Sequence, residues 1–86
     1  MDLELGEAVT QFVARYDNPL SARAYKQVLD GLLAVVPAET PLCDVTREDL
    51  DRWDRAQRAR NLADATIATR RCKIRAFFNW CQSRGY

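Results

Sequence analysis

Apolar residues recur at intervals of three and four along most of the chain, a spacing that gathers side chains on one face of a helix. The first such stripe consists of Leu5, Ala8, Val9, Phe12, Val13 and Tyr16. The second consists of Tyr25, Val28, Leu29, Leu32, Leu33 and Val36. Each stripe predicts an amphipathic helix that buries one face against the rest of the protein.

The boundary between these two helices is predicted at Asn18-Pro19, because the residue before a proline avoids helical backbone angles. Ser21 follows as a candidate N-cap, whose hydroxyl would accept a hydrogen bond from an unpaired backbone N–H of the second helix. Gly31 lies inside the second stripe, where a glycine costs about 1 kcal/mol relative to alanine. Tertiary packing must offset that cost.

The third helix has the clearest start in the sequence, after a loop that contains two prolines in 37–41. Thr46 is a good N-cap, and Asp49 stands three residues later, as in a capping box. Val45, before the cap, can pack on Leu50 as a hydrophobic staple. These signals predict a helix that begins directly after Thr46.

The third helix is expected to end near 58–61, and Asp64 is a candidate cap for a fourth helix. This last helix should run to about Arg84, because Gly85 is a natural terminator. At about 100° per residue, one arc of the fourth helix gathers apolar side chains. This predicted core arc holds Ile67, Ile74, Phe77, Phe78 and Cys81, and the neighbouring arc holds Thr66, Thr69 and Lys73, with Arg70 at the boundary.

No stretch alternates apolar and polar residues as a half-buried strand does, and no Asn-Gly or Asp-Gly hairpin signal is present. A chain of 86 residues allows one domain. We therefore predict a single all-α domain, an orthogonal four-helix bundle over residues 1–86. No run approaches the roughly 18 apolar residues of a membrane span. The acidic start Met1–Glu4 lacks the basic residues of a secretory signal, so we expect a cytoplasmic location and no membrane partner.

The sequence offers little for catalysis or metal binding. It has no histidine, which removes the commonest general base and the commonest metal ligand. The three cysteines lack Cys-x-x-Cys spacing, and we expect reduced thiols. A carboxylate cluster at Asp49, Asp51 and Asp54 is better explained by its place near a helix start. We predict no catalytic residue, no metal and no cofactor in this chain.

Charge is distributed unevenly although the formal net charge is only +1. Residues 1–50 hold nine acidic and four basic residues, a net −5, whereas residues 51–86 hold three acidic and nine basic residues, a net +6. Such asymmetry indicates a surface for a polyanion. A solvated charged surface would explain the charge distribution equally well.

The arrangement of donors favours nucleic acid over a merely solvated surface. Residues 65–75 of the fourth helix carry several donors and no carboxylate, and the start of the second helix is similar. Rigid helices with such donors suit contact with phosphates. The predicted DNA-binding residues are Ser21, Arg23, Lys26, Thr66, Thr69, Arg70 and Lys73. We interpret Trp53 and Trp80 as core or groove fillers, and expect Arg71 to lay its stem on apolar surface with its head in water.

Three motifs carry a resemblance to a known family. The second helix opens Leu20-Ser21-x-x-Ala24, the third region reads Leu42-x-x-Val45-Thr46-x-x-Asp49-Leu50, and the fourth helix reads Ala65-Thr66-Ile67-x-x-Arg70-x-x-x-Ile74-Arg75-x-Phe77-Phe78-x-Trp80. In order and spacing they resemble the N-terminal core-binding domain of tyrosine recombinases, the SAM-like domain of phage integrases. The chain departs from the family pattern with Ala24 for threonine, Arg71 for leucine and Lys73 for a small residue.

The resemblance implies a helical bundle that forms half of a clamp around duplex DNA, with two helices approaching the major groove. It implies DNA contacts for the same residues of the second and fourth helices. The family's catalytic residues lie in a separate C-terminal domain. The chain would therefore be an excised fragment or, as an alternative, a natural orphan domain, and Tyr86 would not be a nucleophile. The implied partners are duplex DNA, that catalytic domain and other recombinase protomers. An open alternative is a protein-interaction bundle whose basic face meets an acidic partner; a small enzyme is a remote third.

Overall fold

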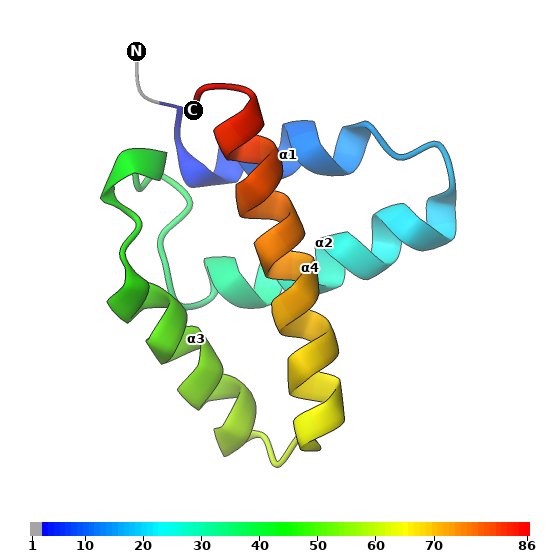
Figure 1. Cartoon of the computed structure of the whole chain (residues 1–86), viewed down its shortest axis with the longest axis vertical. Coiled ribbons are helices and arrows are strands. Elements are labelled where there is room, and N and C mark those ends of the chain that lie inside the picture. Colours follow the sequence, from blue (N-terminus) through cyan, green and yellow to red (C-terminus); the bar gives the residue numbers. More distant parts are fainter. Residues whose placement is uncertain (1–2) are drawn as a thin grey trace.

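The computed structural model describes residues 3–86, and all its extended elements are helices. Helix α1 (Leu5–Ala14) and helix α2 (Pro19–Leu33) run in opposite directions as a hairpin, and helix α4 (Asp64–Ser83) lies across both (Figure 1). Helix α3 (Arg47–Ala59) packs beside α2 and α4. The predicted all-α architecture with four helices is confirmed. Met1 and Asp2, part of the acidic start, lie outside the described residues.

The start of α2 differs from the prediction, because Asn18 and not Ser21 is its N-cap. The Asn18 side-chain oxygen accepts a hydrogen bond from the backbone N of Leu20 at 2.9 Å. Pro19 occupies the first helical position, where its fixed φ suits a helix and its missing N–H needs no partner. Ser21 therefore lies within the first turn of α2. Helix α1 already ends at Ala14, before the proline is reached.

The start of α3 confirms the predicted capping box. The Thr46 hydroxyl accepts from the backbone N of Asp49 at 3.3 Å, and the Asp49 carboxylate accepts from the backbone N of Thr46 at 2.9 Å. Arg52 also donates to that carboxylate. These bonds lower the pKa of Asp49, with the backbone bond of Thr46 as the largest cause. A 3₁₀ turn at Leu42–Asp44 leads into this start.

At the ends of α4, the predicted Asp64 cap is wrong and the predicted Gly85 terminator is confirmed. Ala63 is the N-cap, and no side chain caps this end. Asp64 is instead the first helical residue, and its carboxylate accepts from Arg58 at 3.3 Å. Asn61, with φ of 60°, turns the chain between α3 and α4. Gly85, with φ of 77°, terminates the helix as predicted.

Aromatic rings from three helices meet at the centre of the fold. Phe12 of α1 is 1% exposed and contacts the rings of Tyr25 on α2 and of Phe77 and Trp80 on α4, with centroids 5.3–5.4 Å apart. Phe77 is 0% exposed, whereas Phe78 is only partly buried. Phe78, predicted in the same arc, packs against the core but is not fully buried, because its ring lines the groove between α4 and α3. The other predicted members of the arc, Ile67, Ile74, Phe77 and Cys81, are buried.

The loop before α3 closes against the start of α1. The backbone N of Gly6 donates to Ala38 O and that of Leu5 to Thr40 O, both at 2.8 Å. An isolated bridge between Glu4 and Pro41 is the one strand-like pairing within residues 3–86. A Cβ on Gly6 would lie 2.9 Å from the Cβ of Ala38, so the loop approaches at a distance that only glycine allows.

A candidate nucleic-acid interface

Helix α4 meets α2 and α3 on different sides, and this divides its cations into two sets. The Lys73 ammonium lies 5.3 Å from the ring centroid of Tyr25 on α2. The Arg71 guanidinium, two residues earlier, bonds the carboxylate of Asp54 on α3. Arg71 and Lys73, although close in sequence, therefore contact different helices on opposite sides of α4.

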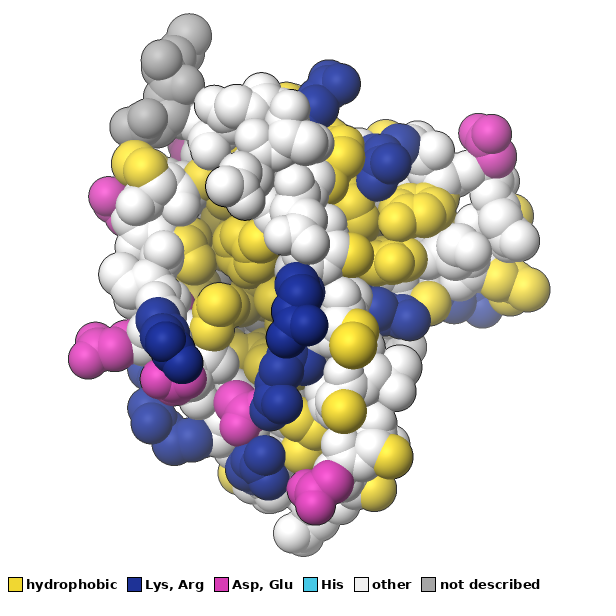
Figure 2. Space-filling view, viewed as in Figure 1, with side chains coloured by type: hydrophobic (Ala, Val, Ile, Leu, Met, Phe, Trp, Pro, Cys, Tyr) yellow, Lys and Arg dark blue, Asp and Glu magenta, His cyan; other side chains and the backbone are white. Residues whose placement is uncertain are grey.

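The α3 side is rich in paired charges. Asp54 accepts from both Arg71 and Arg58, the latter at 3.0 Å, and Arg58 also reaches Asp64. The hydrogen bonds from Arg71 and Arg58 lower the pKa of the Asp54 carboxyl. Figure 2 shows basic side chains along α4 with acidic ones beside them on this face. The head of Arg71 is therefore held by Asp54, a partner that the sequence analysis did not anticipate.

Arg70, predicted at the boundary between the core arc and the arc of Thr66, Thr69 and Lys73, is directed toward α3. Its guanidinium donates to the side-chain oxygen of Gln57 on α3 at 3.1 Å. Gln57 is a polar residue only 3% exposed, so this bond satisfies a buried acceptor. Arg70 is half-buried and has a structural task, but its remaining N–H groups are not used by that bond.

The α2 side of α4 carries polar side chains, and residues 65–83 contain no carboxylate. The Thr69 hydroxyl donates to the backbone O of Ala65 at 3.0 Å, so it meets a phosphate only by giving up that bond. Thr66, Thr69 and Lys73 are spaced by three and four residues and share one face, and both threonines are exposed. On α2, Ser21 is half-buried in the first turn and Arg23 is exposed. Arg23 has no ion pair within residues 3–86. Lys73 contacts Tyr25, which follows Ser21 by about one helical turn, whereas Arg23 is about 160° away from Tyr25 around α2.

Lys26 does not lie with the others. It lines a groove between α1 and α2, beside Val9, Val13 and Leu33, to which α4 contributes no residue. Its ammonium forms an ion pair with Asp30 at 2.8 Å. The structure thus separates Lys26 from Thr66, Thr69 and Lys73.

Two further cations, which the sequence analysis did not single out, flank Trp80. Arg15 lies 5.6 Å and Arg84 lies 5.7 Å from the centroid of its ring. Arg84 follows Lys73 by about three helical turns, so the helical arc of α4 contained the signal for it. Arg15 belongs to a different helix, and only the crossing of α1 and α4 brings it here. Trp80 itself fills the crossing against Phe12, in keeping with its interpretation as a groove filler.

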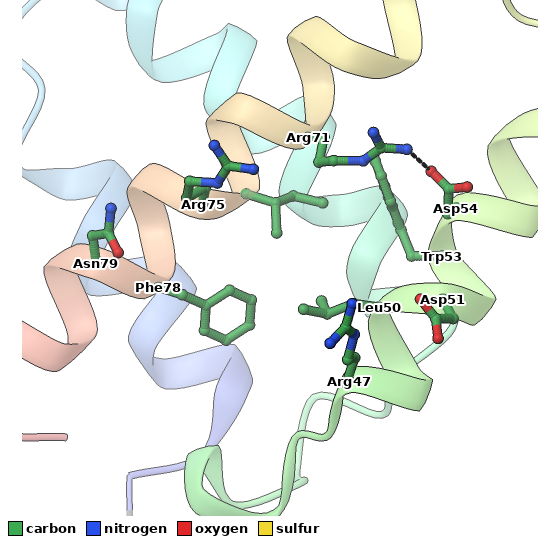
Figure 3. Close-up of a pocket in the computed structure, with 10 residues that line it drawn as sticks. Arg47, Leu50, Asp51, Trp53, Asp54, Arg71, Arg75, Phe78 and Asn79 are labelled. Carbon is green, nitrogen blue, oxygen red and sulfur yellow. Dashed lines mark hydrogen bonds and ion pairs between the residues drawn. The ribbon is translucent and has the colours of Figure 1, made fainter. Parts of the chain in front are cut away.

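A groove of about 500 Å³ lies between α3 and α4. Phe78 points from α4 toward Leu50 on α3, with Trp53 behind them (Figure 3). Arg47, Arg75 and Asp51 line it as well, and the first two have no ion pair in the described part of the chain. Its shape and lining suit an apolar side chain flanked by acidic groups.

Three further properties of the described residues concern metal ligands, the buried thiol and helix hydropathy. Within residues 3–86, no group of three or more histidine, cysteine, aspartate and glutamate side chains is placed to hold a metal ion. Burial raises the pKa of the Cys81 thiol to about 11, so it is protonated at neutral pH and a poor nucleophile. None of the helices described here is both long enough and apolar enough to cross a membrane.

The helical architecture and the order of its elements place the chain among small all-α domains. A family model described as "Phage integrase, N-terminal SAM-like domain" matches residues 11–85. The chain belongs to this family, which confirms the resemblance carried by the sequence motifs. In integrases, this N-terminal domain is a non-catalytic domain. Comparison with the curated proteins and with the solved structures found no match.

Proposed function

We propose that this chain is the DNA-binding domain of a tyrosine recombinase or integrase. In that role it forms one half of a clamp around duplex DNA, and a C-terminal catalytic domain forms the other half. Other recombinase protomers on the same DNA would be its further partners. The observation that supports the proposal is the contact of Lys73 with Tyr25, which brings the carboxylate-free side of α4 against α2.

We call this surface the α2–α4 face and propose that it consists of Ser21, Thr66, Thr69, Arg70 and Lys73, with Arg23 at a distance round α2. Hydroxyl and cationic donors on two rigid helices are what phosphate contacts require. The ion pairs of Asp54 lie on the other side of α4, so those carboxylates do not oppose a phosphate here. Lys26, predicted with this set, is left out because it pairs with Asp30 in the α1–α2 groove.

Binding through such a face should be weak and should depend on salt. A single module without its clamp partner is expected to show non-specific affinity, on the order of 10⁻⁴–10⁻⁶ M. If about four phosphates are neutralised, the slope of log K against log salt should be near −3.6. Phosphate contacts position the domain but carry little base information, so unrelated duplexes should bind alike.

The direct test is a fluorescence anisotropy titration of a labelled duplex with the purified domain at several salt concentrations. We expect binding that weakens linearly in the log–log plot and differs little between unrelated sequences. Absence of salt-sensitive binding at low ionic strength would overturn the proposal.

A second candidate function is protein interaction, with an acidic partner. The α3–α4 groove favours it, because Leu50 and Phe78 form an apolar floor and Arg47 and Arg75 stand at its edges without ion pairs in residues 3–86. An acidic peptide with a leucine or aromatic anchor is the probe for it. Binding of that peptide, lost in Phe78→Ala, together with no binding of duplex DNA, would favour this function over the first.

A further inference from the structure

Arg15 occupies the C-cap of α1 and lies over three aromatic rings. Its guanidinium carbon is 5.2 Å from the ring centroid of Phe12, 5.4 Å from that of Tyr16 and 5.6 Å from that of Trp80. Such contacts hold an arginine in place through the ring quadrupole. The Tyr16 hydroxyl is also a hydrogen-bond neighbour of the guanidinium, and the other N–H groups of Arg15 are not used by this contact.

Arg84 reaches the same tryptophan from the C-cap of α4, where its guanidinium carbon is 5.7 Å from the Trp80 centroid. The indole is braced by edge-to-face contacts with Phe12 at 5.3 Å and Tyr86 at 5.7 Å. Since both guanidinium groups lie near one centroid, they are at most about 11 Å apart. This value is an upper limit on their separation; both arginines also line one hollow, so their flexible side chains can turn toward one anion there.

None of the described residues that line the hollow beside this pair is acidic. This shallow hollow is lined by Gln11, Ala14, Arg15, Trp80 and Arg84. Neither arginine forms an ion pair with any carboxylate of residues 3–86. Arg58 and Arg71 differ in this respect, because each is paired with Asp54. The cations at Trp80 are therefore available to an external anion.

The hollow is connected to the α2–α4 face through the aromatic cluster. Tyr16, under Arg15, stacks on Tyr25 with centroids 4.8 Å apart and planes inclined by 16°. The Lys73 ammonium in turn lies over the ring of Tyr25. Lys73 and Arg15 thus rest on rings that touch each other, and neither is paired with an acid in the described residues. This places the hollow beside the surface proposed to bind DNA.

We propose that Arg15 and Arg84 together bind one backbone phosphate of duplex DNA, with Trp80 as the support that positions both guanidinium groups. The inference rests on the proposed function and extends its contact surface to α1 and to the end of α4. Arginine suits this task because its planar fork makes paired, charge-assisted hydrogen bonds to phosphate oxygens.

A purely structural role is the competing explanation. Cations near helix C-termini are favourable to the helix dipole, and both arginines stand at such ends. That role predicts a loss of stability on substitution and no effect on DNA. The structural explanation therefore predicts a change in melting temperature, whereas phosphate binding predicts a change in DNA affinity and its salt dependence.

The test uses Arg15→Gln and Arg84→Gln, which keep much of each side-chain stem over the rings and remove the charge. Arg75→Gln is the matched control, since Arg75 lies on the α3–α4 groove. Each variant is titrated with a labelled duplex across a salt series, and its melting temperature is recorded. Arg84→Lys is included because it keeps the charge and loses the fork.

We expect each glutamine variant to bind about tenfold more weakly, since one set of charge-assisted bonds is lost. The log–log salt slope should shrink by about 0.9, and the double variant should lose little more, because one phosphate is shared. Arg84→Lys should retain the slope and lose affinity. Arg75→Gln should leave the slope within about 0.3 of wild type.

Two results would overturn the inference while leaving the proposed function intact. One is wild-type salt dependence in both Arg15→Gln and Arg84→Gln, with binding lost in Lys73→Ala. The other is a lower melting temperature in the arginine variants with unchanged affinity and slope. If the wild-type domain shows no salt-sensitive binding, the proposed function itself fails, and the inference fails with it.

Discussion

Phe12 of α1 and Phe77 of α4 meet edge to face, with centroids 5.4 Å apart and planes inclined by 80°. This contact joins the α1–α2 hairpin to the helix that lies across it. Both rings are almost fully buried. The position of α4, and with it that of Lys73 over Tyr25, depends on this contact.

The two adjacent phenylalanines of α4 should respond very differently to truncation. Phe77→Ala is expected to reduce the free energy of unfolding by about 3–5 kcal/mol, because it leaves a cavity beside Phe12. Phe78→Ala should reduce it by roughly 1 kcal/mol or less, because the Phe78 ring is already partly exposed in the α3–α4 groove. Chemical denaturation of both variants measures the difference. Equal losses would show that the core is not centred on Phe77.

Replacing each of two helical glycines, Gly6 and Gly31, with alanine should change stability in opposite directions. Gly31→Ala is expected to stabilise the domain by about 0.5–1 kcal/mol, since a Cβ there meets Trp53 Nε1 at 3.6 Å, an ordinary contact. Gly6→Ala should destabilise it by about 1–3 kcal/mol, because its Cβ would collide with Ala38. Thermal melting of the two variants should shift in opposite directions. A shift of both in one direction would contradict the packing described for one of these sites.

Asp54 should contribute to the dependence of stability on pH. Its folded-state pKa is lowered by the hydrogen bonds of Arg71 and Arg58, so its stabilising effect is present above the unfolded-state pKa of about 3.9. That effect is lost as the pH falls through the lower folded pKa. Because the pairs are partly exposed, Asp54→Asn should reduce stability at pH 7 by only about 0.5–1 kcal/mol.

The difference between Asp54→Asn and wild type should narrow as the pH is lowered below about 4. Asp51→Asn is the control, because Asp51 is exposed on the same helix and has no ion pair in residues 3–86. Urea midpoints measured from pH 7 to pH 2 provide the comparison. A difference that stays constant over this range would exclude the ion pairs of Asp54 as its source.

Local signals predicted the elements of this fold well, and tertiary relationships account for what they missed. The box at Thr46 and Asp49 depends on four consecutive residues, so the sequence contains all of it. The Ser21 cap failed because Asn18, directly before Pro19, already supplies an acceptor to Leu20. Phe78 packs on the core but is less buried than its place in the arc suggests, because a helical arc does not show how much of a neighbouring helix covers it.

In the candidate site, too, local spacing predicted some features, and the packing of the helices determined the others. The common face of Thr66, Thr69 and Lys73 follows from helical spacing alone. The pairing of Arg71 with Asp54 and the position of Lys26 beside α1 follow from how the helices pack, which no local pattern specifies. The meeting of Arg15 with Arg84 at Trp80 joins residues from opposite ends of the chain, and it required the fold.

The central claim, that α4 docks on DNA through its α2 side, is tested most directly by comparing Lys73→Ala with Arg75→Ala. Both changes remove one positive charge from the same helix, but Lys73 lies over Tyr25 and Arg75 lines the α3–α4 groove. The measurement is the log–log salt slope of duplex binding for each variant. We predict that Lys73→Ala reduces the slope by roughly one unit and weakens all sequences alike, whereas Arg75→Ala changes it far less. Equal losses in the two variants would indicate a general field effect and contradict a docked helix.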